Sequence, residues 1–130
     1  MSKSCAVVVR AFDGEAPYLQ SFIDHHRRIG IAQFYVVLAP NAAPLCRAIV
    51  AKNDLCVIES DGQRVRDATD HVREDYVAVI DADEYLHPAL IDFIEQESFQ
   101  SLAMPWRMTA TLDADGFASP SKRFFTFPQI

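Results

Sequence analysis

An apolar run that ends in three acidic residues constrains this chain more than any other segment. Residues 77–84 read Val-Ala-Val-Ile-Asp-Ala-Asp-Glu. The apolar part is typical of a buried strand, and because unpaired carboxylates are costly to bury, the acids must lie where that strand leaves the sheet. In open α/β sheets, ligands bind at the carboxyl ends of the strands. The segment therefore predicts a strand over residues 76–80 with a polar site at its end.

The spacing of these acids favours a metal half-site. Asp81 and Asp83 are two residues apart, and on an extended strand such side chains point to the same side, with Glu84 on the other. Two carboxylates together form an oxygen-rich half-site for a hard cation such as Mg²⁺ or Mn²⁺. The alternative is a solvated loop of acids that also caps the helix expected after Pro88.

The rest of the chain alternates between strand and helix patterns. Apolar runs predict strands at 5–12, 33–39, 55–59, 76–80 and 102–108, and helical spacing predicts helices at 16–29, 44–52, 63–73 and 88–96. This alternation predicts an α/β fold with an open, mostly parallel sheet and helices on both of its faces. We expect one domain over residues 1–130.

Composition excludes several classes of function. A net charge of −6 argues against a nucleic-acid binder, which would carry a basic patch or stripe. No uninterrupted apolar stretch is long enough for a membrane span, and the first residues lack the apolar core of a signal peptide. Cys5, Cys46 and Cys56 show no metal-type spacing, so they predict reduced, mostly buried thiols in a cytoplasmic protein.

Two further segments are candidates for the same site. Glu15 lies in the turn after the first strand, which reaches the same sheet edge as Asp81 if the two strands are parallel. It either contacts a ligand there or only complements the dipole of the next helix. For His25 and His26, at the end of that helix, we expect one ring to pack inward rather than a metal site.

Together these segments resemble the glycosyltransferase family 2-like proteins. That family shares a (K/R)xxNEAPYLxEWxxHHxxxG opening, a DxDE(F/Y)L strand end and a later WRxFG-like strand. The matching segments of this chain occur in the same order, at residues 15–19, 25–30, 81–86 and 106–108. The chain departs from the pattern at Gly14, where the family has Asn, at residues 39–41, which lack an Asp, and after Trp106, where Phe-Gly is absent.

The resemblance implies a GT-A fold that binds a nucleotide-diphosphate sugar together with Mn²⁺ or Mg²⁺. It makes Asp83 the metal ligand, with Asp81 at the ribose or at the metal through water, and it places Glu15 near the base or ribose. Trp106 either stacks on a ring of the donor or is an ordinary buried Trp. Family members continue well past this length, so the resemblance implies a donor-binding N-terminal half of a truncated or split protein.

We therefore expect a metal-dependent glycosyltransferase with an unknown acceptor. One alternative is a non-catalytic nucleotide-sugar-binding or interaction module. Another is a Mg²⁺-dependent phosphohydrolase with Asp81 as nucleophile, although that chemistry usually places its acid pair after the first strand. Near the C-terminus, Phe124, Phe125 and Phe127 predict an edge strand or a homo-oligomer interface, because three exposed rings would form an apolar patch.

Overall fold

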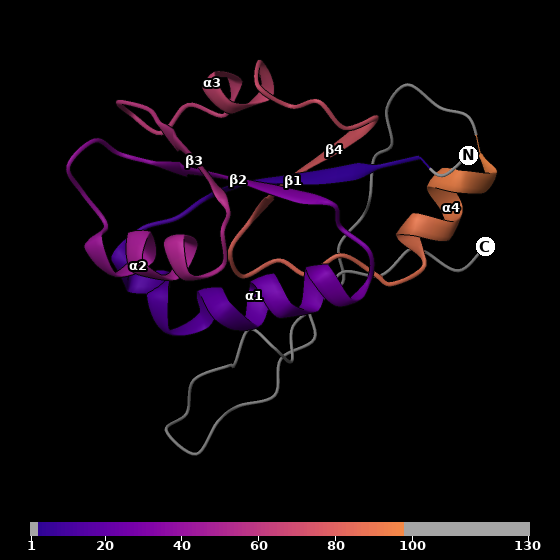
Figure 1. Cartoon of the computed structure of the whole chain (residues 1–130), viewed down its shortest axis with the longest axis horizontal. Coiled ribbons are helices and arrows are strands. Elements are labelled where there is room, and N and C mark those ends of the chain that lie inside the picture. Colours follow the sequence, from indigo (N-terminus) through magenta and orange to yellow (C-terminus); the bar gives the residue numbers. More distant parts are fainter. Residues whose placement is uncertain (1–2, 98–130) are drawn as a thin grey trace.

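The computed structural model describes residues 3–97, which form an α/β arrangement around a parallel sheet (Figure 1). The strands are β1 (Cys5–Arg10), β2 (Gln33–Leu38), β3 (Cys56–Glu59) and β4 (Tyr76–Asp81). They lie in the order β3-β2-β1-β4, and each neighbouring pair is parallel. Within the described residues, the predicted α/β class with a parallel sheet is confirmed.

Some of the predicted features lie outside the described residues. These are the strand at 102–108 with Trp106, and the apolar segment that contains Phe124, Phe125 and Phe127.

Helices lie on both faces of the sheet, as predicted. The helical elements are η1 (Asp13–Glu15), α1 (Ala16–Arg28), α2 (Pro44–Lys52), α3 (Arg66–Thr69) and α4 (Leu90–Gln96). Figure 1 shows α1 and α2 beneath the sheet and α3 above it. In the part of the chain that the structure describes, no helix is long and apolar enough to cross a membrane.

Alternate residues of β1 contribute to two cores. Val7 and Val9 belong to the larger core, which also contains buried residues of α1, α2 and α4. Ala6 and Val8 belong to a smaller core with Ala68 of α3. This is the alternation expected of a strand that is covered on both faces. Because β1 is central, its end is held firmly on both sides.

The first helix forms where its sequence predicts it. Pro17 lies in the first turn, where a missing N–H costs nothing. The apolar stripe is buried at Leu19, Phe22, Ile23 and His26. After the helix the chain passes through Gly30 with φ of 107°, a conformation that residues with a Cβ rarely adopt. The stripe and the glycine together fix the length of α1.

Two helices are shorter than predicted. The polar segment at 63–73 is helical only over α3, and its start is delayed because Gln63 has φ of 50°, in the left-handed region. The Gln63 side chain instead donates hydrogen bonds to the backbone carbonyls of Ala11 and Val37. The helix predicted from residue 88 begins at Leu90. Tertiary hydrogen bonds outweigh local helix preference in the first case.

The fourth strand is less buried than its apolar sequence predicts. Ala78 is buried, but 40% of Val77 and 52% of Val79 is exposed. These two valines lie in register with Ala6 and Val8, so they are on the α3 face of the sheet. The interpretation of residues 76–80 as a fully buried strand is therefore wrong for the described part of the fold, where one face of β4 is open to solvent.

Candidate functional site

The ends of β1 and β4 mark the place where the sheet grows in two directions. The chain adds β2 and β3 on one side of β1 and then adds β4 on the other. In open α/β sheets, ligands bind outside the carboxyl ends of the strands at such a switch point. The last residues of the two strands, Arg10 and Asp81, lie opposite each other in register. A ligand site of this sheet is therefore expected beside Arg10 and Asp81.

Residues 81–84 form a hydrogen-bonded turn, which we call the acidic turn. The Glu84 N–H donates to the Asp81 carbonyl at 3.0 Å, and Glu84 Oε1 accepts from the Asp81 N–H at 2.8 Å. Glu84 therefore folds back on the strand end, whereas Asp81 and Asp83 are exposed. The strand ends at Asp81, so Asp83 lies in the turn itself. The strand alternation used to pair the two aspartates does not apply, since only Asp81 is on the strand.

The same arrangement follows the end of β1. The Glu15 N–H donates to the Phe12 carbonyl at 2.9 Å, and Glu15 Oε1 accepts from the Phe12 N–H at 3.3 Å. The glutamate side chain satisfies a backbone amide three residues earlier, as in one half of a capping box, and the other bond is an ordinary turn hydrogen bond to a backbone carbonyl. Glu15 and Glu84 thus both stabilise the turns that follow the two strands. These bonds from the two glutamates to the backbone were not predicted, although each glutamate follows its backbone partner by three residues in the sequence.

The negative charges of Asp81 and Asp83 act on both Glu15 and Glu84. Partial burial raises the pKa of Glu15, the hydrogen bond from the Phe12 N–H lowers it, and the negative charges of Asp83 and Asp81 raise it further. Burial also raises the pKa of Glu84, against the effect of the Asp81 N–H, and the same two aspartates add to the rise. The turns after β1 and β4 therefore share one region of negative potential.

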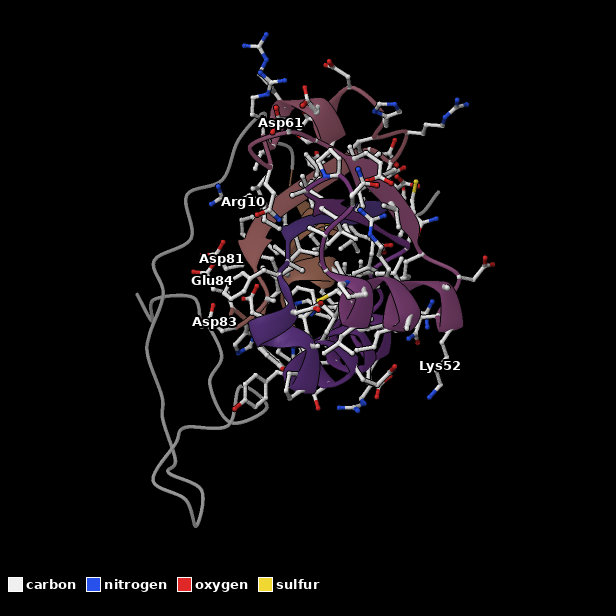
Figure 2. All side chains as sticks on the ribbon, turned by 90° about the vertical axis from the view of Figure 1, so that its left-hand side faces the viewer. Arg10, Lys52, Asp61, Asp81, Asp83 and Glu84 are labelled. Atoms are coloured by element: carbon white, nitrogen blue, oxygen red, sulfur yellow. The ribbon has the colours of Figure 1, made fainter. Side chains whose placement is uncertain are left out.

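A cation already lies beside this acidic region. Figure 2 shows Arg10, Asp81, Asp83 and Glu84 along one edge of the molecule, with Lys52 on the opposite side. The Arg10 guanidinium is 3.9 Å from Asp81 Oδ1, and 54% and 57% of the two side chains are exposed. Arg10 was not among the residues predicted for this site. The sequence indicates only that Arg10 lies at the end of the first strand. Its pairing with Asp81 is given by the register between β1 and β4 in the structure.

Asp81 and Asp83 could supply two oxygen ligands to a hard cation. Among residues 3–97, no group of three or more His, Cys, Asp or Glu side chains is placed to hold a metal ion. Water and the oxygens of an anionic ligand could fill other positions around a cation bound here, as phosphates commonly do for Mg²⁺. Trp106, predicted to belong to the same site, lies outside the described residues.

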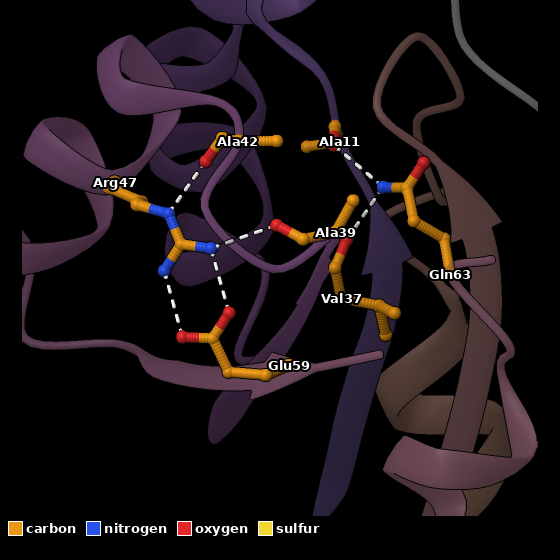
Figure 3. A network of polar contacts seen from close by, with 7 residues as sticks. All are labelled: Ala11, Val37, Ala39, Ala42, Arg47, Glu59 and Gln63. Carbon is orange, nitrogen blue, oxygen red and sulfur yellow. Dashed lines mark hydrogen bonds and ion pairs between the residues drawn. The ribbon is translucent and has the colours of Figure 1, made fainter. Parts of the chain in front are cut away.

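Gln63 connects the ends of β1 and β2 at the same sheet edge (Figure 3). Its Nε2 donates to the Ala11 carbonyl at 2.8 Å and to the Val37 carbonyl at 3.0 Å. The Val37 carbonyl also accepts the Ala11 N–H at 3.3 Å, so Gln63 adds a side-chain link where the ends of β1 and β2 are already joined through the backbone. Gln63 was not foreseen as part of this edge, because nothing local in the sequence indicates its left-handed backbone.

The loop between β2 and α2 is fixed by Arg47 (Figure 3). Its side chain donates to the Ala39 carbonyl at 2.9 Å and to the Ala42 carbonyl at 2.6 Å. Two of its nitrogens also pair with the Glu59 carboxylate at 2.9 and 2.7 Å. This loop contains residues 39–41, where the chain lacks the Asp of the glycosyltransferase pattern. Its backbone is held in one conformation even though that Asp is absent.

The two histidines at the end of α1 pack as predicted. The His26 ring is buried, and its centroid is 4.3 Å from that of Phe22. Burial lowers the pKa of His26 to about 3, although its hydrogen bond to the Phe22 carbonyl acts in the opposite direction. His26 is therefore a neutral imidazole at physiological pH. His25 is half-buried, and burial lowers its pKa as well.

The chain was also compared with known proteins. No model of a known protein family matches it, and neither a curated protein nor a solved structure does. The case for a function therefore rests on the switch-point geometry and the acidic turn.

Proposed function

We propose that this chain binds a nucleotide-diphosphate sugar together with Mn²⁺ or Mg²⁺, as the donor-binding part of a glycosyltransferase. The observation that carries the proposal is a pair of exposed aspartates, Asp81 and Asp83, at the switch point of a parallel sheet. That position is the general ligand site of such sheets, and two carboxylates are the protein share of a typical Mg²⁺ site.

The charge at this edge explains why a metal would be required. A sugar diphosphate brings negative charge to a region that already holds four carboxyl groups, two of which have raised pKa values. At a separation of ~4 Å, each like-charge pair costs about 1 to 4 kcal/mol in a solvated to partly buried setting. A divalent cation between the aspartates and the diphosphate converts this repulsion into attraction and stabilises the diphosphate as it leaves.

Arg10 and Glu15 support the same ligand. Arg10 is an exposed guanidinium beside Asp81, and guanidinium groups pair well with phosphate oxygens. Glu15 directly precedes the 13-residue helix α1, whose first-turn amides favour a phosphate nearby. The metal, Arg10 and the helix start would together match the diphosphate, and the carboxylate of Glu15 would suit ribose hydroxyl groups.

Calorimetry with the full chain tests the proposal. We expect UDP- or GDP-sugars to bind in the presence of Mn²⁺ and to bind at least about tenfold more weakly without it, given the charge repulsion above. Asp83→Asn should abolish the metal dependence. Asp61→Asn is the matched control, because Asp61 carries the same charge and lies just after β3, at the same sheet edge but three strands away from β4.

Other results would separate the alternatives. Equal binding with and without Mn²⁺, in the parent and in Asp83→Asn, would contradict the metal-dependent donor site. Binding without sugar transfer to any acceptor in a glycan array would favour the non-catalytic binding module. Release of inorganic phosphate, abolished by Asp81→Asn, would favour the phosphohydrolase.

A further inference from the structure

The backbone of Leu86 is held from both sides by the two histidines of α1. His25 Nε2 lies 2.8 Å from the Leu86 carbonyl oxygen, and the Leu86 N–H donates to His26 Nε2 at 3.1 Å. One histidine therefore donates to Leu86 and the other accepts from it. We call the two imidazoles and the Leu86 peptide groups the histidine clamp.

The protonation of each imidazole follows from these partners. His26 Nε2 accepts a hydrogen bond, so its proton must be on Nδ1, which donates to the Phe22 carbonyl at 2.7 Å. His25 must carry its proton on Nε2, because a carbonyl oxygen can only accept. Two neighbouring histidines are thus required as opposite tautomers. A doubly protonated His26 could not accept the Leu86 N–H.

The clamp lies directly after the acidic turn. Leu86 follows Glu84 by two residues, and the intervening Tyr85 is buried against the same rings, with its centroid 4.8 Å from that of His25 and 5.6 Å from that of His26. The turn is therefore fixed at both ends. It is attached to β4 on one side and to α1 through the clamp on the other.

We propose that His25 and His26 are positioning residues that hold the acidic turn in the conformation that binds a divalent cation. The proposal rests on the metal site proposed above, but the clamp itself is defined by hydrogen bonds that need no metal. Neither histidine would touch the cation or the nucleotide. Their contribution is to limit the conformations of residues 81–86, so that Asp81 and Asp83 need not be ordered on binding.

The two test variants, His25→Phe and His26→Phe, keep an aromatic ring but remove its hydrogen bonds. His25→Phe retains an aromatic ring beside Tyr85 and loses the donor to the Leu86 carbonyl. His25→Gln supplies an amide N–H in its place and serves as the conservative rescue. His71→Phe is the matched control, because His71 is an exposed histidine whose ring bonds to the Asp67 carbonyl on α3. His26→Phe is a second test. It leaves the buried Leu86 N–H without its acceptor, so we expect it to cost stability as well.

Two readouts separate the clamp from the metal site. In the metal-free protein, we expect His25→Phe to speed hydrogen exchange of the Glu84 and Leu86 amides about tenfold, while exchange in β2 is unchanged. With Mn²⁺ alone as ligand, we expect its affinity to fall about tenfold, as when a residue that orients a metal ligand is removed. His25→Gln should recover most of both effects, and His71→Phe should show neither.

Each outcome has a distinct meaning. If the parent protein does not bind Mn²⁺, the metal part of the proposed function fails, and amide exchange still decides whether the clamp orders the turn. If Mn²⁺ binds and His25→Phe changes neither its affinity nor the exchange of Glu84 and Leu86, the positioning role is overturned. Equal acceleration of exchange throughout the sheet would also overturn it, since that indicates a general loss of stability.

Discussion

Arg10 and Asp81 are the last residues of adjacent parallel strands, and their side chains approach to 3.9 Å at the exposed edge of the sheet. An exposed ion pair of this length contributes little to stability, with a typical value below about 1 kcal/mol. The relationship matters instead because Arg10 is the cation that would have to share Asp81 with a metal. We expect Arg10 to weaken the binding of a metal ion alone and to strengthen the binding of a nucleotide diphosphate.

We expect Arg10→Gln to strengthen binding of Mn²⁺ alone and to weaken binding of the nucleotide diphosphate. Removing the guanidinium removes a competing positive charge at Asp81, but it also removes a charged hydrogen-bond donor to phosphate, worth about 1.5 to 3 kcal/mol. Calorimetric titration with Mn²⁺, and then with UDP or GDP in saturating Mn²⁺, measures both. Lys52→Gln is the control, since Lys52 lies on the opposite side of the molecule (Figure 2). If the affinities for Mn²⁺ and for the nucleotide diphosphate both rose or both fell, the proposed place of Arg10 between the metal and the diphosphate would be contradicted.

Divalent cations should stabilise the folded chain through Asp81 and Asp83. A ligand at 100 times its dissociation constant stabilises the state that binds it by about 2.7 kcal/mol. We expect Mn²⁺ at that excess to raise the urea midpoint of the parent and of Asp61→Asn, but not of Asp81→Asn or Asp83→Asn. The same stabilisation in all four proteins would indicate binding elsewhere.

Glu84 should behave as a backbone cap rather than as a metal ligand. Glu84→Ala removes the acceptor for the Asp81 N–H and should lower the free energy of unfolding by about 1 kcal/mol, as the loss of a capping side chain does. Glu84→Gln keeps an acceptor and removes a charge, so we expect it to be at least as stable as the parent at pH 7. Urea unfolding of both variants measures the difference.

The pH dependence of the Glu84 variants has a definite sign. The pKa of Glu84 is raised in the folded protein, so the folded state holds its proton more tightly than the unfolded state. The stability contributed by that proton is present below the unfolded pKa and is lost as the pH rises through the folded pKa. The advantage of Glu84→Gln over the parent should therefore be largest near pH 7 and disappear below about pH 4, near the unfolded pKa of a glutamate. An advantage that grows toward acid pH would be inconsistent with this cause.

His26 should make the fold sensitive to acid. Burial lowers its pKa from 6.5 to about 3, so below pH 6.5 the unfolded state takes up a proton that the folded state excludes. Stability should therefore fall by up to about 1.4 kcal/mol per pH unit between these two values. Urea unfolding of the parent and of His26→Phe at pH 7, 6 and 5 isolates this contribution. We expect the difference in unfolding free energy between them to change in favour of the variant as the pH falls, and a constant difference would contradict the assignment.

Local patterns were enough to predict most of the elements. The helix over Pro44–Lys52 has the predicted bounds, and β1, β2 and β3 differ from prediction by one or two residues at their ends. These segments combine a clear apolar period with a proline or a turn at the boundary. Their local preferences and their tertiary contacts agree, so the sequence pattern is sufficient.

The candidate site was harder to predict from the sequence than the helices and strands, because most of its geometry depends on tertiary contacts. The position of Asp81 at the end of β4 follows from the apolar run before it. The left-handed backbone of Gln63 does not, because it is compensated by hydrogen bonds to two distant strands. The same holds for the opposition of Arg10 and Asp81, which depends on a register between strands far apart in the chain. The exposure of Val79 could not be predicted either, because its apolar side chain is typical of a core position.

The position of β4 beside β1 has a consequence for the order of folding. The first link between the two strands joins Ser4 to Asp75, which are 71 positions apart, whereas β1 and β2 are joined through the short α1 connection. Closing a long loop costs more entropy than closing a short one, so contacts of high sequence separation tend to form late. We therefore expect β1, β2 and β3 to pair first, and Arg10 to meet Asp81 only in the final step. The edge of the sheet that would bind a cation would then be the last part of this fold to exist.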